Sequence, residues 1–171
     1  MKGLVHIYEG TGKGKSTAGV GLTIRCAGNG FPVVYSQFLK DGTTGEMNIL
    51  RKIPNITVLV EEHHFGFSFL MTPEEKVEAK AAYTALFEKV KAAAVEQNAR
   101  LLVMDEMLDL CNAELIDTAM VVDFLKNRPE QLEVVMTGRN PKPELVELAD
   151  YITNMNAVKL SLIHISEPTR H

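Results

Sequence analysis

The chain is poor in the residues that mark several specialised classes of protein. Among its 171 residues it has no tryptophan, two cysteines and an aromatic fraction of 6%. The two cysteines, Cys26 and Cys111, stand far apart and show neither a C-x-x-C motif nor a Cys/His spacing, which argues against a zinc site and a disulfide-rich fold. We therefore expect both side chains to be thiols in the core.

Positive charge and long apolar runs are also scarce. The formal net charge is −4 at pH 7 and the sequence pI is near 5.7, so no general basic surface for a nucleic-acid partner is expected. The first apolar run, residues 4–8, is far shorter than the roughly 20 residues of a membrane span, and we expect no membrane association. The hydrophobic fraction of 46% suits a single globular domain.

The last residues do not continue the pattern of the domain. Residues 160–170 read Leu-Ser-Leu-Ile-His-Ile-Ser-Glu-Pro-Thr-Arg, which is one translated frame of a DNA adaptor used in transposase-based sequencing libraries. We therefore interpret residues 160–171 as a translated artefact, which is excluded from fold prediction. The predicted domain is residues 1–159, truncated at its C-terminal end.

A glycine-rich segment near the start predicts a phosphate site. Residues 10–17 read Gly-Thr-Gly-Lys-Gly-Lys-Ser-Thr and lie between an apolar run at 4–8 and a helix-compatible stretch at 18–27. In a strand, loop and helix of this order, backbone N–H groups and the helix N-terminus face the phosphates, Lys15 adds a charge, and the Ser16 hydroxyl reaches Mg²⁺. The match to G-x-x-x-x-G-K-[ST] is imperfect, because Glu9 stands at the first glycine. A flexible turn with solvated lysines is the alternative.

A second element supports a nucleotide site. The apolar run at 101–104 is followed directly by Asp105 and Glu106, which is typical of a buried parallel strand that carries a carboxylate to its C-terminal edge. There Asp105 would hold Mg²⁺ opposite Ser16, with Glu106 as a second ligand or polarising group. A helix N-cap is the other interpretation of Asp105. The two motifs together predict nucleoside triphosphate binding.

The alternation of elements predicts the fold class. Apolar runs predict strands at 4–8, 33–38, 56–60, 101–104, 132–137 and 150–155, and helical patterns separate them at 18–27, 47–52, 72–98, 118–127 and from 143. Thr72, Pro73 and Glu75 predict an N-cap, a first helical residue and a capping box. The aromatic-rich segment 61–71 is predicted as a loop. We expect an α/β fold of three layers, similar to P-loop NTPases, with a mostly parallel central sheet and ligands at its C-terminal edge.

Several short motifs together resemble one family. In order they are residues 11–17, Gln37-Phe38-Leu39-Lys40, Gly45-Glu46 with Asn48, Gly66-Phe67-Ser68-Phe69, Val103-Met104-Asp105-Glu106, Asn127-Arg128-Pro129, Thr137-Gly138-Arg139 and Leu148-Ala149-Asp150. Each motif is weak alone, but their order and spacing over residues 3–159 resemble the P-loop type of ATP:corrinoid adenosyltransferase. The resemblance implies transfer of the 5′-deoxyadenosyl group of Mg-ATP to the Co(I) of a corrinoid, with release of triphosphate, in adenosylcobalamin biosynthesis or salvage.

The resemblance also implies roles for individual residues. The nucleotide would lie reversed relative to ordinary P-loop ATPases, and Mg²⁺ would be held by Ser16 and Asp105. Phe67 and Phe69 would lie against the lower face of the corrin and exclude its axial base, although core packing is the alternative for both. The catalytic residues implied are Lys15, Glu106, Phe67 and Phe69. The nucleotide-binding residues implied are Gly10, Thr11, Gly12, Lys13, Gly14, Lys15, Ser16, Thr17 and Arg139.

Partners and location follow from the resemblance alone. It implies a cytoplasmic homodimer that receives electrons from a reduced flavin or a flavodoxin-type donor. Two other functions remain open at this point. A small-molecule kinase would need a base aimed at an acceptor hydroxyl and an arginine-bearing lid, and no lid segment is evident. A non-catalytic nucleotide switch would use residues 65–69 as a surface for a partner protein.

Overall fold

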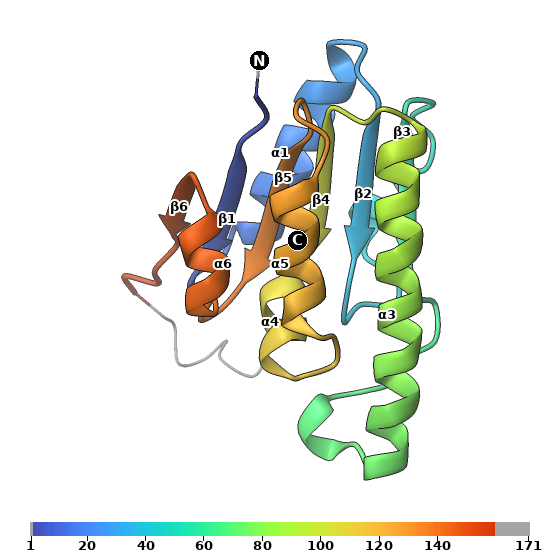
Figure 1. The fold of residues 1–171 in the computed structure, drawn as a ribbon, viewed down its shortest axis with the longest axis vertical. Coiled ribbons are helices and arrows are strands. Elements are labelled where there is room, and N and C mark those ends of the chain that lie inside the picture. The colour runs from blue at the N-terminus through green and yellow to red at the C-terminus, as the bar shows by residue number, and fades with distance from the viewer. Residues whose placement is uncertain (1, 160–171) are drawn as a thin grey trace.

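The fold is built on one central sheet that runs through the described part of the chain. The computed structural model describes residues 2–159, so the prediction for residues 160–171 concerns residues outside this range. Six strands form the sheet in the order β3-β2-β4-β5-β1-β6, and every pairing is parallel (Figure 1). The strands are β1 (Val5–Glu9), β2 (Val33–Gln37), β3 (Ile56–Val60), β4 (Leu101–Asp105), β5 (Glu133–Gly138) and β6 (Tyr151–Asn154).

Helices cover both faces of the sheet. Helices α1 and α2 pack on one face, and α3, α4, α5 and α6 pack on the other, so the predicted three-layer α/β fold is confirmed (Figure 1). Because both faces are covered, all five residues of β2 and of β4 are buried, as their apolar runs predict. The helices are α1 (Lys15–Gly28), α2 (Gly45–Leu50), α3 (Pro73–Glu96), α4 (Met107–Asn112), α5 (Thr118–Asn127) and α6 (Pro143–Leu148).

The structure departs from the sequence-based prediction in two places. Helix α4 was not predicted, because it is only six residues long and follows β4 after the single residue Glu106, which has a left-handed φ of 66°. The segment predicted as a loop contains a short 3-10 helix, η1 (Ser68–Leu70).

The start of α3 follows the predicted capping pattern. The Thr72 side chain accepts a hydrogen bond from the Glu75 backbone N–H at 3.2 Å, and Pro73 is the first helical residue. Thr72 therefore satisfies one of the free N–H groups of the first turn. None of the helices within residues 2–159 combines the length and the apolar character that a membrane crossing requires.

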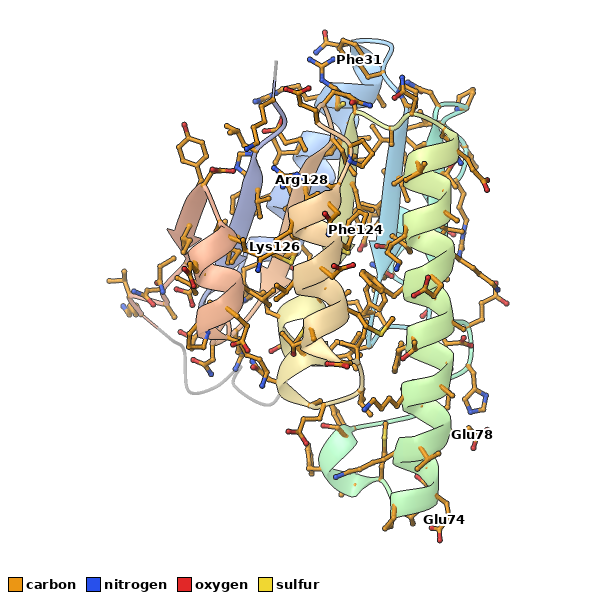
Figure 2. The ribbon with its side chains drawn as sticks, viewed as in Figure 1. Phe31, Glu74, Glu78, Phe124, Lys126 and Arg128 are labelled. Carbon is orange, nitrogen blue, oxygen red and sulfur yellow. The ribbon has the colours of Figure 1, made fainter. Side chains whose placement is uncertain are left out.

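Arg128 ties the end of α5 to the start of the chain. Its guanidinium donates to the carbonyl oxygens of Leu125 at 2.6 Å, Leu132 at 3.2 Å and Gly3 at 2.6 Å. Figure 2 shows Arg128 at the end of α5 beyond the exposed Lys126. Carbonyl groups in the last turn of a helix lack partners within the helix. Arg128 satisfies one of these, that of Leu125, and links it to Leu132 in the turn that leads into β5.

The parallel arrangement brings the carboxyl ends of all strands to one edge. The glycine loop follows β1 there, Asp105 ends β4, and Gly138 ends β5. In Figure 1 the segment between β3 and α3, with η1 and the first turns of α3, extends past this same edge. The fold therefore places the predicted phosphate loop and the aromatic segment at the same end of the molecule.

Candidate nucleotide and corrinoid site

The glycine loop has the predicted position between β1 and α1. Gly14 caps α1 with a left-handed φ of 111°, and Gly10 has a φ of 127°. The Lys15 Nζ donates to the Gly12 carbonyl oxygen at 2.9 Å. Lys15 thus folds back over its own loop, with its charge held at the position where phosphates bind in loops of this type.

The chain that follows β6 closes one side of this loop. The Gly12 N–H donates to the Met155 carbonyl oxygen at 2.6 Å, and a Cβ at either Gly10 or Gly12 would lie 2.5 Å from that oxygen. Only glycine fits at such a distance, since real Cβ atoms do not approach an oxygen so closely. The two glycines therefore allow close contact with Met155, the residue that follows β6, as well as freedom of the backbone.

Glu9, which replaces the first glycine of the usual pattern, also contacts this chain. Its carbonyl oxygen accepts from the Met155 N–H at 2.7 Å, and its carboxylate accepts from the Asn154 side-chain amide. The larger side chain is accommodated because it points to the neighbouring edge strand rather than into the loop. This gives a structural reason for the departure from the usual motif.

Ser16 and Asp105 lie in direct contact at the carboxyl edge. The Ser16 Oγ donates to the two carboxylate oxygens of Asp105, at 2.8 and 3.1 Å. Thr137 Oγ1, at the end of β5, donates to Asp105 Oδ1 at 2.6 Å and accepts from the Glu106 N–H at 2.9 Å. The Asp105 side chain is fully buried, so these partners are what stabilise its charge.

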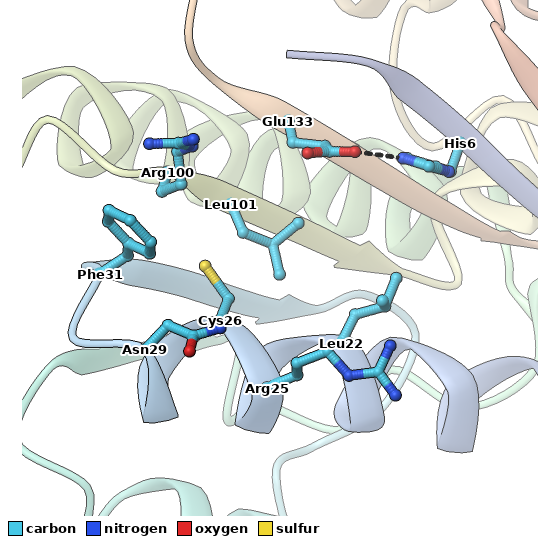
Figure 3. Close-up of a pocket in the computed structure, with 9 residues that line it drawn as sticks. All are labelled: His6, Leu22, Arg25, Cys26, Asn29, Phe31, Arg100, Leu101 and Glu133. Carbon is cyan, nitrogen blue, oxygen red and sulfur yellow. Dashed lines mark hydrogen bonds and ion pairs between the residues drawn. The ribbon is translucent and has the colours of Figure 1, made fainter. Parts of the chain in front are cut away.

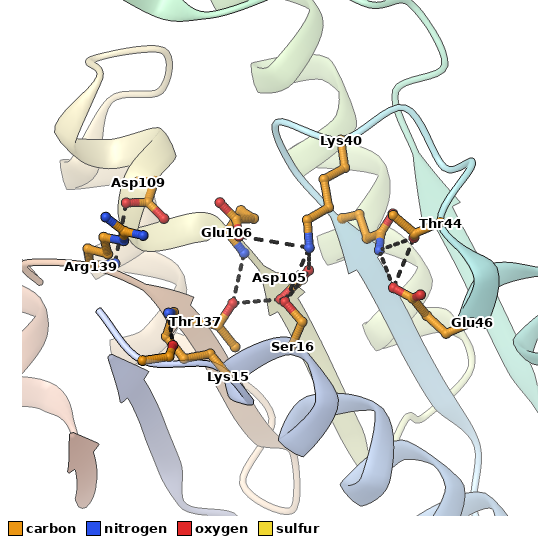
Figure 4. A network of polar contacts seen from close by, with 12 residues as sticks. Lys15, Ser16, Lys40, Thr44, Glu46, Asp105, Glu106, Asp109, Thr137 and Arg139 are labelled. Carbon is orange, nitrogen blue, oxygen red and sulfur yellow. Dashed lines mark hydrogen bonds and ion pairs between the residues drawn. The ribbon is translucent and has the colours of Figure 1, made fainter. Parts of the chain in front are cut away.

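Lys40 completes this cluster of charges, and sequence reasoning assigned it no role. Its Nζ lies 2.9 Å from Asp105 Oδ2, 3.2 Å from Ser16 Oγ and 3.8 Å from Glu106 Oε1 (Figure 4). Burial lowers the pKa of Lys40, but the carboxylates, Asp105 above all, outweigh it and raise that pKa above its ordinary value. The sequence did contain a sign of this role, because Lys40 stands just beyond the end of the strand predicted at residues 33–38, where ligands bind in parallel sheets.

A cation fits among these oxygens, as the Lys40 ammonium demonstrates. Hydroxyl and carboxylate oxygens are also the ligands that Mg²⁺ prefers, usually one or two carboxylates together with phosphate oxygens of the substrate. Within residues 2–159 no group of three or more His, Cys, Asp and Glu side chains gathers into a metal site. Ser16 and Asp105 offer one hydroxyl and one carboxylate, which are donors of the kind that Mg²⁺ takes from a protein when it binds with phosphates.

A hydrogen-bonded group fixes the loop that carries Lys40. The Gln37 Nε2, at the end of β2, donates to Thr44 Oγ1 and Glu46 Oε1, both at 3.1 Å, and Thr44 Oγ1 donates to Glu46 at 2.9 Å. Gln37 is fully buried. These contacts hold the start of α2 against β2, and Figure 4 shows them next to Lys40.

Glu106 lies beside this cluster and is more buried than an ordinary carboxylate. Its pKa is raised to about 7, mainly by desolvation and in addition by the neighbouring Asp105 and Asp109, while Lys40 acts in the opposite direction. The structure thus brings Lys15, Ser16, Asp105 and Glu106 to one edge, as predicted.

Other predicted residues lie at the rim of the site. Arg139 follows β5, and its N–H donates to Asp109 Oδ1 at 3.3 Å while its side chain is exposed beside Asp109 (Figure 4). Thr11, Lys13 and Thr17 are exposed on the glycine loop and the first turn of α1. These side chains face solvent at the edge where the loop opens.

Phe67 and Phe69 lie on the separate segment beyond this edge. Their rings stack with centroids 5.4 Å apart and an interplanar angle of 19°, yet they are 69% and 78% exposed. Leu70, beside them, is 70% exposed. The alternative of core packing for the two phenylalanines is therefore wrong. The segment presents a flat apolar surface to solvent at the carboxyl end of the sheet.

A hollow of about 240 Å³ lies at the opposite, amino-terminal edge (Figure 3). It is smaller than most ligand pockets, which measure about 300–1,000 Å³. Within it the His6 Nε2 lies 2.6 Å from Glu133 Oε1, and the Arg100 guanidinium lies 4.6 Å from the centre of the Phe31 ring. No residue of the glycine loop lines the hollow, so it is separate from the candidate site.

The raised pKa of Glu106 predicts how pH affects the stability of the metal-free protein. Between the ordinary pKa of 4.5 and the folded-state pKa of about 7, the folded protein binds more protons than the unfolded chain, so rising pH destabilises it. Glu106→Gln has no carboxyl group at this position and so does not lose this stability as pH rises. We expect the unfolding free energy of the variant minus that of wild type to increase by up to about 3 kcal/mol between pH 4.5 and about 7. Urea denaturation in EDTA measures both free energies. The exposed control Glu78→Gln should show no such rise, and a flat profile for Glu106→Gln would contradict the assignment.

Comparison with known proteins places the chain in a family. The model of the family described as ATP:corrinoid adenosyltransferase BtuR/CobO/CobP matches residues 1–165. A corrinoid adenosyltransferase from Sinorhizobium sp is 34% identical over 160 residues, covering 92% of this chain and 74% of that protein. Corrinoid adenosyltransferases from Pseudomonas aeruginosa and Salmonella typhimurium are 29% and 28% identical, each over 92% of this chain and 77% and 79% of their own lengths.

Among solved structures, the fold is similar to ATPase domains. A structure of EssC (ATPases 2 and 3) from Geobacillus thermodenitrificans has a TM-score of 0.52 and 15% identity, over 95% of this chain and 33% of that one. This likeness concerns the fold alone, and it agrees with the predicted P-loop NTPase-like architecture. The family match over residues 1–165 and the 34% identity to the Sinorhizobium protein lead to one conclusion: the chain belongs to the ATP:corrinoid adenosyltransferase family.

Proposed function

We propose that this chain transfers the 5′-deoxyadenosyl group of Mg-ATP to the Co(I) centre of a corrinoid and releases triphosphate, in the formation or salvage of adenosylcobalamin. The observation that carries the proposal is the exposed Phe67–Phe69 stack beyond the edge that holds the glycine loop. A phosphate loop alone suits many reactions. A broad apolar surface at the same end of the sheet suits a large planar substrate such as a corrin ring.

The charges of the glycine loop suit a triphosphate leaving group. In the proposed reaction a bond forms between cobalt and the ribose C5′, the C5′–O5′ bond breaks, and the electron pair of that bond leaves with the triphosphate. Co(I) is a strong nucleophile, so the protein supplies orientation and charge rather than a base. Lys13 and Lys15 would neutralise the triphosphate, with Gly10, Thr11, Gly12, Gly14, Ser16, Thr17 and Arg139 as further contacts.

The oxygens of Ser16 and Asp105 are proposed to hold Mg²⁺, with Glu106 as the second carboxylate of the site. When bound, Mg²⁺ would neutralise part of the triphosphate charge. The contact of 2.8 Å between Ser16 Oγ and Asp105 supports this assignment, since it places a hydroxyl and a carboxylate at one point beside the loop.

Phe67 and Phe69 are proposed to pack against the lower face of the corrin. There they would exclude the axial base, which makes the cobalt easier to reduce to Co(I). Their exposure supports this role, because two stacked benzyl rings gain free energy when an apolar surface covers them.

The cellular setting of the reaction is proposed from membership of the family. We propose a homodimer in the cytoplasm that receives electrons from a reduced flavin or a flavodoxin-type donor. ATP and a cobalamin or a cobyrinic acid derivative are the proposed substrates.

The identity of the products distinguishes the proposed reaction from phosphoryl transfer. Incubation with Mg-ATP and chemically reduced cobalamin should give a light-sensitive adenosyl product and intact tripolyphosphate, because the bond to C5′ is the one that breaks. Chromatography of the nucleotides and phosphates measures both. Formation of ADP in place of tripolyphosphate would favour a kinase.

The two halves of the site should respond separately to substitution. Lys15→Ala should weaken ATP binding by about tenfold to hundredfold, because it removes a charge-assisted contact. Phe69→Ala should leave ATP binding unchanged and slow formation of the adenosyl product by about tenfold, because it removes apolar contact with the corrin. Calorimetry measures the first effect and the absorbance of the product the second.

A matched control is Val95→Ala, which removes an exposed apolar side chain near the C-terminal end of α3, away from the aromatic segment that precedes this helix. It should change neither quantity. Equal loss of ATP binding in Lys15→Ala and Phe69→Ala would be incompatible with the separate roles assigned to the two residues.

A further inference from the structure

We propose that Lys40 is a positioning residue whose ammonium takes the place of the divalent cation in the free protein, so that the metal enters the site together with the nucleotide. The inference rests on the proposed function only in naming Ser16 and Asp105 as the metal-binding pair. It adds a role for a side chain that contacts neither the glycine loop backbone nor the aromatic segment in the described contacts.

The position of the Lys40 Nζ carries the proposal. It lies within hydrogen-bond distance of Ser16 Oγ and Asp105 Oδ2, at 3.2 and 2.9 Å, and its third acidic neighbour, Glu106 Oε1, is 3.8 Å away. These are the same oxygens that are suited to Mg²⁺. An ammonium and a metal ion cannot both occupy the point between them, because two cations at such a distance repel strongly in a partly buried site.

The backbone holds Lys40 at this point. Leu39, the residue before it, has a left-handed φ of 61°, which is uncommon for a residue other than glycine. Phe38, one residue earlier, donates its backbone N–H to the carbonyl oxygen of Asp105 at the end of β4, at 2.9 Å. On the other side, Asp41 Oδ1 accepts from the N–H and the hydroxyl of Thr43, at 3.1 and 2.5 Å, which closes a turn. Lys40 thus lies on a loop of defined conformation, which holds its side chain near Asp105.

The charge balance of the cluster explains why a cation is needed there. Asp105 is fully buried and the Glu106 side chain is 26% exposed. Their carboxylate oxygens lie 2.9 and 3.8 Å from the Lys40 Nζ, so two acidic groups face the same small volume. Without a cation, their mutual repulsion and desolvation would oppose the approach of Ser16 and the close packing of the strand ends. Lys40 supplies one positive charge when no metal is present.

The arrangement has a consequence for the order of binding. A metal ion alone must displace the ammonium and gains only a hydroxyl and carboxylates in return. A metal ion bound to a triphosphate brings phosphate oxygens as further ligands. The displaced ammonium of Lys40 can then form an ion pair with the negatively charged triphosphate. The free protein should therefore bind divalent cations weakly, and removal of the ammonium should strengthen that binding.

The test measures binding of Mn²⁺ to the nucleotide-free protein, by electron paramagnetic resonance of the free ion. Lys40→Met keeps the apolar stem and removes the charge. We expect it to bind Mn²⁺ about tenfold or more tightly than wild type. Lys40→Arg, which keeps the charge, should bind as weakly as wild type. Lys52→Met removes an equal charge from an exposed position and should also leave binding unchanged.

A gain of metal binding separates this role from a purely structural ion pair. If Lys40 only stabilised the fold, Lys40→Met would lower the melting temperature and leave Mn²⁺ binding unchanged, which would overturn the proposal. Addition of Asp105→Asn to Lys40→Met should abolish the gain. Should Lys40→Met not fold without metal, Mg²⁺ must raise its yield on refolding more than that of wild type, and the lack of such a rise would also overturn the proposal.

This experiment uses neither corrinoid nor ATP. Failure of the Mn²⁺ test would leave the proposed adenosyl transfer in place, since that reaction is tested by its products. Conversely, formation of ADP in the product assay would refute adenosyl transfer without affecting the displacement of Lys40 by a metal ion.

Discussion

The buried carboxylate of Asp105 is the interaction on which the carboxyl edge of this structure depends. It accepts hydrogen bonds from Ser16 at the start of α1 and from Thr137 at the end of β5, and it pairs with Lys40 beyond β2. Three segments from different parts of the chain therefore converge on one charge. Because that charge is fully buried, loss of its partners would leave it uncompensated, which is strongly destabilising. The same carboxylate is the proposed ligand of Mg²⁺, so the group that organises the edge would also hold the metal.

The proposed site joins two surfaces of opposite character. The glycine loop and its lysines provide backbone N–H groups and positive charge, whereas the segment with Phe67 and Phe69 provides exposed aromatic rings. The parallel sheet is what places both at one end, since every strand finishes there. Adenosyl transfer needs this combination, because its two substrates are a polyanion and a large apolar ring. An ordinary phosphoryl transfer would not need the second surface.

The sequence predicted the strands, the covered sheet and the residues of the glycine loop because these depend on local patterns. Apolar runs bounded by glycine or proline mark buried parallel strands, and Thr72 with Pro73 marks a helix start. Contacts between distant segments were not predictable in the same way. The pairing of Glu9 with Asn154 and the approach of Lys40 to Asp105 arise from tertiary packing over 145 and 65 residues of sequence. Helix α4 was not predicted because it has only six residues, too few to show a helical periodicity, and it begins directly after the left-handed residue Glu106.

The most direct test of this account is the orientation of the bound nucleotide relative to the aromatic segment. A crystal structure of the protein with Mg-ATP and a cobalamin would measure it. The account predicts the triphosphate on the glycine loop, Mg²⁺ on Ser16 and Asp105, and the ribose C5′ directed at a cobalt that lies over Phe67 and Phe69. A nucleotide with its C5′ turned away from these rings, or a corrinoid bound elsewhere on the molecule, would contradict it.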